Sequence, residues 1–184
     1  MDAFLTTDRL VLRRMTEADL DDLISLHNDP VVMRFLTGGK PVSREQVERE
    51  YHDVFSKDGY WVAAERGTGA FHGWFAFHPT PDRDAGQREL GYRLRRLAWG
   101  KGYATEGSRA LIERGFADPA IRRVWAQTMA VNIPSRRVME KAGLTLERVF
   151  HLEWDDPLPG TEQGEVEYGL DRATRERHQL AQRD

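Results

Sequence analysis

Two glycines separated by a single residue, Gly100 and Gly102, form the part of the sequence best suited to hold a ligand. They lie in the hexapeptide Trp-Gly-Lys-Gly-Tyr-Ala at 99–104, between a strand-like run over 89–94 and a helix-like run that ends at Phe116. Glycine lets the backbone approach a ligand closely, and a helix start offers unpaired N–H groups at its positive dipole end. The hexapeptide therefore predicts a cradle for a diphosphate. The alternative use of such a loop is a tight structural corner.

A second region with chemical potential follows the strand-like run over 124–130. The pattern over 132–144 predicts a capped amphipathic helix that is closed by a glycine. Asn132 is suited to be its N-cap, and Ser135 shares a helix face with Met139. Ser135 is therefore predicted to face inward. The alternative is that Asn132 and Ser135 only cap the helix.

Together these regions resemble the signature regions of the GNAT superfamily of acyl-CoA-dependent N-acetyltransferases. Within it, the chain is most similar to the RimJ/RimL-like branch of ribosomal-protein N-terminal acetyltransferases. The resemblance covers nearly the whole chain, from an opening strand at 7–13 to a closing strand at 166–170. Further landmarks occur in the same order at 28–33, 89–92, 99–106 and 132–144.

This resemblance implies an α/β (α+β) fold, with a mixed, mostly antiparallel twisted sheet of about six to seven strands and about four helices. It implies acetyl-CoA as the acyl-donor substrate. No metal is expected, because the histidines show no paired ligand spacing. The pantetheine arm is expected where the strands at 89–94 and 124–130 splay apart. The residues implied to bind the coenzyme are Tyr92, Arg93, Leu94, Gly100, Lys101, Gly102, Tyr103, Ala104, Asn132 and Ser135.

Two positions depart from the superfamily pattern. Trp99 stands where the family's loop motif begins with Gln or Arg, so diphosphate binding is expected to rest on backbone N–H groups and Lys101. Met139 stands where many members have a tyrosine that is thought to protonate the departing thiolate. The Asn-x-x-Ser arrangement of the RimJ/RimL-like branch resembles this chain, and it implies that Ser135 hydrogen-bonds the sulfur of CoA while Asn132 orients the arm.

Acetyl transfer to an amine needs a neutral nitrogen, because an ammonium has no lone pair for attack. Glu89 is the leading candidate for the proton acceptor, since it begins the strand that is implied to carry the thioester. Glu65 and Asp155 are weaker candidates. Glu89 could instead be a solvated partner of Arg88, and solvent could take the proton.

Composition sets limits on other kinds of function. The chain has 184 residues, of which 40% are hydrophobic and 31% charged, as expected for one globular domain. A net charge of −3 gives no general attraction to nucleic acid or to anionic membranes. The absence of cysteine excludes disulfides and thiolate sites, and the six histidines show no paired ligand spacing. We expect a cytoplasmic enzyme without a signal peptide or membrane span.

Along the chain, sequence patterns predict helices over 16–27 and 43–55, each opened by a capping pair, with a Gly- and Pro-rich loop over 29–41 between them. Strand-like runs follow at 60–65 and 71–78. We expect a single domain over 1–184, with a core at about 8–172 and a loosely ordered tail over 173–184.

These patterns predict an acetyl-CoA-dependent N-acetyltransferase that acts on a primary amine. The alternatives are a catalytically silent acyl-CoA-binding module, a transferase that uses a different acyl-CoA, and a nucleotide-binding module of another fold. The acceptor, a protein N-terminus or a small-molecule amine, is not specified by the sequence. Its selectivity is expected to depend on the 29–41 loop and the last hairpin, in a monomer or a homodimer.

Overall fold

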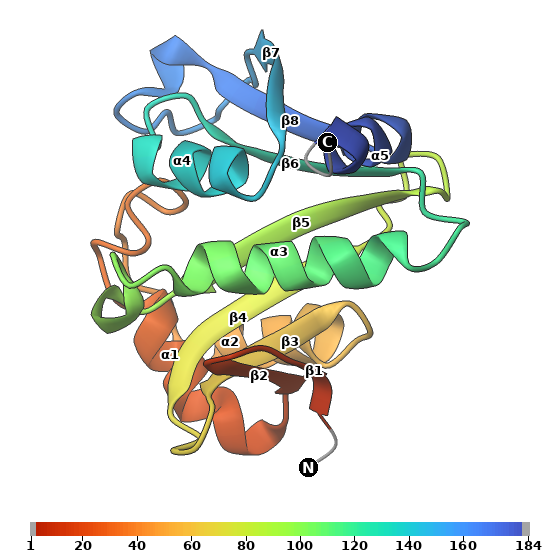
Figure 1. Cartoon of the computed structure of the whole chain (residues 1–184). Helices are drawn as coiled ribbons and strands as arrows, with labels where there is room; N and C mark the ends of the chain where they lie inside the picture. Colours follow the sequence, from red (N-terminus) through yellow and green to blue (C-terminus); the bar gives the residue numbers. More distant parts are fainter. Residues whose placement is uncertain (1–2, 182–184) are drawn as a thin grey trace. The chain divides into compact units, whose positions relative to one another are not determined.

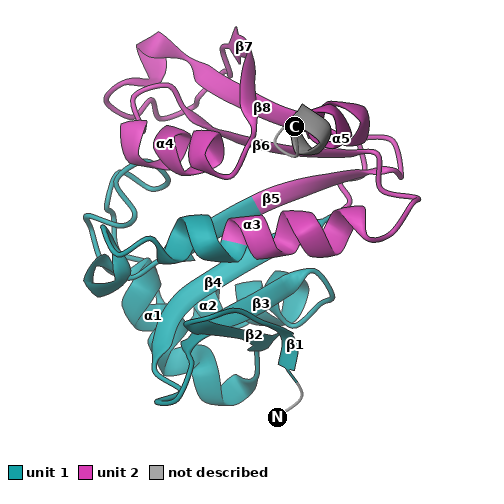
Figure 2. Ribbon diagram, viewed as in Figure 1, with its two compact units in different colours: residues 1–78, 91–107 teal, residues 79–90, 108–184 magenta. Residues whose placement is uncertain are grey.

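The computed structural model describes residues 3–181. Contacts between Cα atoms group the chain into two compact units, which Figure 2 shows in different colours. Unit 1 comprises residues 1–78 and 91–107, and unit 2 comprises residues 79–90 and 108–184. Strand β5 (Gln87–Leu94) and helix α3 (Tyr103–Phe116) each begin in one unit and end in the other.

Unit 1 contains an antiparallel set of strands and two helices (Figure 1). Its strands are β1 (Ala3–Thr6), β2 (Leu10–Arg14), β3 (Tyr60–Glu65) and β4 (Phe71–His78), with the end of β5. Its helices are α1 (Leu20–His27) and α2 (Arg44–Glu50), the second of which continues as a wider turn over Tyr51–Phe55. Short 3₁₀ turns occupy Glu17–Asp19 and Arg96–Ala98.

In unit 2, the start of β5 pairs in parallel with β6 (Arg123–Met129), through Gln87–Arg123, Arg88–Val124 and Glu89–Trp125. Strand β8 (Glu165–Asp171) lies antiparallel between β6 and β7 (Thr145–Phe150). The helices are α4 (Ile133–Lys141) and α5 (Arg172–Ala181), and a 3₁₀ turn occupies Thr161–Gln163.

Hydrogen-bonded strands follow the order β1-β2-β3-β4-β5-β6-β8-β7, and the expectation of a mixed, mostly antiparallel sheet is confirmed. The strand count is eight rather than about six to seven. The additional strand is β1. Most of its residues are exposed, so its sequence has no alternation of apolar and polar residues that would predict a strand. It is held by pairing with β2 and by the ring of Phe4, which stacks on Trp61 at 4.1 Å.

The helix caps of unit 1 form where the sequence predicts them. Asp19 closes the capping box with Thr16, and its carboxylate also receives two hydrogen bonds from Arg13, at 2.8 and 2.6 Å. Ser43 accepts a hydrogen bond from the backbone N–H of Gln46 at 3.2 Å. These caps set the starts of two helices whose apolar residues join one buried cluster with β3 and β4: Leu23, Leu26, Val47, Phe55, Val62 and Trp74 among them.

The expectation of a loosely ordered tail over 173–184 misses helix α5, which extends from Arg172 to Ala181. Arginine contacts hold this helix in place. Arg175 pairs with Glu113, and the guanidinium of Arg172 donates to the carbonyl of Ile121 and lies 5.3 Å from the ring of Phe116. The helix has few apolar residues and is held by polar contacts with distant residues, which is why the sequence did not indicate it. Residues 182–184 of the expected tail lie outside the described residues.

Gly107 of α3 packs directly against the Phe75 ring of strand β4. A Cβ at this position would come within 2.3 Å of the Phe75 ring, which is fully buried. We expect Gly107→Ala to lower the free energy of unfolding by about 1–3 kcal/mol because the core is overpacked. In a Phe75→Leu background the same change should cost about 1 kcal/mol less, as measured by a denaturant double-mutant cycle. Equal costs in both backgrounds would contradict this packing.

Candidate active site

The glycine loop adopts the backbone conformation that its sequence suggests. Gly100 and Gly102 have φ of 72° and 85°, values that L residues with side chains rarely adopt. The first α-helical bond of α3 runs from Glu106 N–H to Gly102 carbonyl. The N–H groups of residues 103–105 therefore have no acceptor within the helix. They form a set of donors next to the loop, at the positive end of a 14-residue helix.

An ion pair between Arg9 and Glu106 fixes this loop. Glu106 accepts hydrogen bonds from Thr7 Oγ1 at 2.6 Å, from the backbone N–H of Arg9 at 2.9 Å and from Arg9 Nε at 2.7 Å. The same guanidinium donates to the carbonyl of Lys101 at 2.8 Å. Burial raises the pKa of Glu106, but the hydrogen bonds from Thr7 and Arg9 outweigh it and hold that pKa below its usual range. Strand β2 is thereby linked through Arg9 to both the loop and helix α3.

The side chains of the loop differ in their exposure to solvent. Lys101 is exposed, and Gly100 and Gly102 are open to solvent. Tyr103, by contrast, is buried, with its ring 4.8 Å from His72 and its hydroxyl 3.3 Å from Glu65. Tyr103 can therefore serve a ligand only through its backbone. Ala104 is half-buried in the first turn of the helix.

Trp99 is 44% exposed, and its indole N–H donates to the carbonyl of Leu94 at 2.7 Å. This bond spans the short connection from the end of β5 to the loop. Trp99 is thus a surface aromatic with a structural hydrogen bond.

The three coenzyme residues predicted on β5 have different surroundings. Leu94 is buried, and Tyr92 is half-buried with its ring 6.0 Å from Phe75. The guanidinium of Arg93 lies 5.0 Å from the Trp74 ring and bonds to His27. Any contact of Arg93 with a pantetheine arm would therefore involve its backbone, and this role stays a prediction.

In unit 2, Asn132 caps helix α4 as predicted. Its side chain accepts from Ser135 N–H at 3.5 Å, and its amide donates to Thr128 Oγ1 at 2.9 Å. Ser135 is half-buried, while Met139 is 2% exposed. These contacts account for the helix start. The predicted roles of Asn132 and Ser135 toward the coenzyme are not tested by them.

Glu89 is half-buried in β5 and stands opposite Trp125 in the parallel ladder. Its part as a proton acceptor stays a prediction. Glu65, one of the two weaker candidates, receives hydrogen bonds from Thr68 at 2.7 Å and Tyr103 at 3.3 Å, so its carboxylate already serves the local structure.

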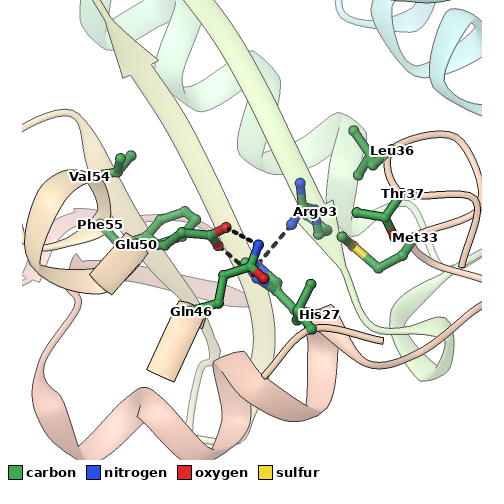
Figure 3. A pocket seen from close by; sticks show the side chains of 10 residues that line it. His27, Met33, Leu36, Thr37, Gln46, Glu50, Val54, Phe55 and Arg93 are labelled. Carbon is green, nitrogen blue, oxygen red and sulfur yellow. Dashed lines mark hydrogen bonds and ion pairs between the residues drawn. The ribbon is translucent and has the colours of Figure 1, made fainter. Parts of the chain in front are cut away.

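Unit 1 also contains a pocket of about 340 Å³ that the sequence did not locate. Figure 3 shows the side chains that line it. Three of them come from the 29–41 loop and one from Val42, which follows that loop, while the others come from α1, α2, the turn that follows α2, and β5. The lining comprises His27, Met33, Leu36, Thr37, Val42, Gln46, Glu50, Val54, Phe55 and Arg93.

The polar groups of this pocket form a chain, Arg93 to His27 to Glu50 (Figure 3). Arg93 Nη1 lies 2.8 Å from His27 Nε2, and His27 Nδ1 lies 3.3 Å from a carboxylate oxygen of Glu50. Because a guanidinium can only donate, Nε2 must accept, and the ring proton stands on Nδ1, where it faces Glu50. The signal in the sequence was a histidine on the apolar face of a helix, followed by Gln46 and Glu50 at helical spacing.

Burial sets the charge states of His27 and Arg93 in this pocket. It lowers the pKa of His27 to about 3, with a further contribution from the Arg93 cation. It also lowers the pKa of Arg93 to about 10, against the opposing effect of Glu50. At neutral pH the imidazole is therefore neutral and the guanidinium remains charged.

Over residues 3–181, no group of three or more His, Asp or Glu side chains is placed to hold a metal ion. Within the same described residues, the helices fall short of the length and apolar character needed to cross a bilayer.

Comparison with known proteins identifies the class. Residues 9–145 match the family model described as an acetyltransferase (GNAT) domain. An Aspergillus fumigatus protein named FsC-acetyl coenzyme A-N(2)-transacetylase is 30% identical over 178 residues, which cover 91% of this chain and 76% of the relative. The chain therefore belongs to the GNAT acetyltransferase family. It is an acetyl-CoA-dependent N-acetyltransferase.

Solved structures share the fold. A GNAT-family acetyltransferase from Bacillus anthracis superposes with a TM-score of 0.76 at 23% identity, over 91% of this chain and 97% of the other. Spermidine N-acetyltransferase from Vibrio cholerae, solved with CoA and spermine, gives a TM-score of 0.74 at 15% identity, over 91% and 98% of the two chains.

The buried, neutral state of His27 predicts how the protein responds to acid. In the unfolded chain His27 binds a proton with an ordinary pKa of about 6.5, whereas in the folded chain its pKa is about 3. The contribution of the neutral His27 to stability is therefore fully present above about pH 6.5, and it falls by about 1.4 kcal/mol per pH unit as the pH drops toward 3. By NMR, the His27 ring resonances should not titrate between about pH 5 and pH 8. An inflection within that range would contradict the assignment.

Proposed function

We propose that this protein transfers the acetyl group of acetyl-CoA to the primary amine of a small molecule, by direct attack within a ternary complex. The observation that carries the proposal is the glycine loop, which leads into the unpaired amide groups at the start of α3 and whose position is fixed by Arg9 and Glu106. We further place the chain in the RimJ/RimL-like branch, on the Asn132-x-x-Ser135 arrangement.

In this proposal the loop binds the diphosphate of CoA through backbone N–H groups from residues 100–104, with Lys101 near the negative charge. The pantetheine arm lies along β5 at Tyr92, Arg93 and Leu94. Amide donors fixed before the ligand arrives lose little freedom on binding, so the energy of the contact goes into affinity.

The chemical step requires the acceptor ammonium to lose one proton, for which Glu89 is the proposed acceptor. The nitrogen lone pair attacks the thioester carbonyl, a C–N bond forms and the C–S bond breaks. A second proton from the nitrogen ends on the sulfur, so CoA leaves as a thiol. Ser135 is proposed to hydrogen-bond that sulfur, since Met139 has no proton to donate.

A small-molecule amine is favoured as the acceptor over a protein N-terminus. The Aspergillus relative is named for transfer to an N(2) position, and the Vibrio structure contains spermine. A pocket of about 340 Å³ falls within the size range of small-ligand sites.

Glu106→Gln tests the anchoring of the loop. The neutral amide has a single acceptor oxygen and no charge, so the ion pair with Arg9 is lost and the loop is held only by the bond from Arg9 to the Lys101 carbonyl. We expect the Kd for CoA, measured by calorimetry, to rise about tenfold. Glu113→Gln, on the exposed side of the same helix, serves as the control and should bind CoA like the wild type. Wild-type affinity in Glu106→Gln would contradict the anchoring role.

Thiol release with a set of small amines tests the two proposed reaction residues. Ser135→Ala keeps the backbone N–H that Asn132 caps, and it should lower kcat about tenfold. Glu89→Gln should lower kcat about a hundredfold or more. Full turnover in both variants would refute these roles while leaving the family assignment intact. CoA binding without thiol release for any amine would identify a silent binding module.

A further inference from the structure

We propose that the pocket in unit 1 binds a second, positively charged group of the acceptor, and that Glu50 is the residue that recognises it. This inference rests on the proposed function and deepens it, because it names the substrate class. The acceptor is a small amine that carries a cationic group at the far end of an apolar spacer.

The walls of the pocket suit an apolar spacer. Met33 and Phe55 are buried, and Leu36 and Val54 are partly exposed at 48% and 36%. Their side chains surround the polar chain of Glu50, His27 and Arg93 (Figure 3). Apolar walls with a few placed polar groups are the usual composition of a small-molecule site.

Glu50 is the one carboxylate in the lining, and its side chain is 38% exposed. One oxygen faces His27 Nδ1, and the other accepts from the Gln46 amide at 3.4 Å. Each carboxylate oxygen has more than one lone pair, so both oxygens keep capacity for a cation from the pocket. The neutral imidazole orients the carboxylate without cancelling its charge.

Arg93 is committed to the structure rather than to a ligand. Its guanidinium donates to His27 Nε2 and lies over Trp74, within the buried wall. By holding the tautomer of His27, Arg93 makes the imidazole a donor toward Glu50. His27 and Arg93 are thus positioning residues, and Glu50 is the group that meets the acceptor.

The pocket also reaches the strand on which the thioester is proposed to lie. Arg93 lines the pocket and belongs to the same stretch of β5 as Tyr92 and Leu94. An acceptor held at Glu50 can therefore extend along its spacer toward β5, where its reacting amine meets the acetyl group.

Three amines of matched length test this inference: 1,6-diaminohexane, hexylamine and 6-aminohexanoate. They share a chain and differ at the far end, which is an ammonium, a methyl group or a carboxylate. We expect the diamine to bind CoA-loaded protein roughly tenfold or more tightly than hexylamine, and 6-aminohexanoate to bind most weakly. Calorimetry on the CoA complex measures this without requiring turnover.

Glu50→Gln should remove the preference, so that the diamine and hexylamine bind equally, with the change in KM rather than in kcat. Glu45→Gln, an exposed carboxylate on the same helix, is the matched control and should keep the preference. A double variant with His27→Gln and Glu50→Gln should lose as much affinity for the diamine as Glu50→Gln alone. A purely structural role of His27 would instead add a further loss of affinity.

Preference for 6-aminohexanoate would overturn the inference in favour of Arg93 as the anchor. Equal binding of all three amines, no binding of any, or an unchanged preference in Glu50→Gln would also overturn it. In each case the CoA titration separates the two proposals. A protein that binds CoA without the preference contradicts only the role of Glu50, whereas a protein that does not bind CoA contradicts the proposed function.

Discussion

The ion pair between Arg9 and Glu106 is the interaction on which the candidate site depends. A loop with two glycines at positive φ has little conformational preference of its own, so its shape must be imposed from outside. Arg9 does this by binding Glu106 and the Lys101 carbonyl together, which joins β2 to the first turn of α3. The same strand start is thereby used for folding and for the alignment of amide donors. Preorganisation of this kind is what converts backbone N–H groups into a binding site.

Much of the fold could be predicted because its elements follow regular patterns. The strands at 60–65 and 71–78 alternate or run apolar between turn residues, and the caps at Thr16 and Ser43 mark their helices. The elements that were missed lack such patterns. Strand β1 is exposed at the sheet edge, and α5 is held by the arginine contacts of Arg172 and Arg175. Contacts between residues distant in sequence are the common cause of both omissions.

The candidate site also has parts that the sequence predicts and parts that it does not. The loop could be located because Gly100, Gly102 and the following helix form a local motif. The ion pair that anchors the loop could not be located from the sequence, since Arg9 lies more than ninety residues from Glu106 along the chain. The pocket was missed for the same reason: His27, Glu50 and Arg93 come from three separate elements, and only folding brings them within hydrogen-bonding distance. Local patterns thus predict which backbone is suited to bind, whereas the tertiary fold decides which side chains position it.

The central claim is that amide groups around Gly100 and Gly102 bind the diphosphate of CoA. Amide NMR spectra of the protein, recorded with CoA and with pantetheine, test it most directly, because pantetheine lacks the diphosphate. The account predicts that CoA shifts the resonances of residues 100–104 strongly and that pantetheine leaves them in place. Equal shifts with both compounds, or shifts with neither, would contradict it.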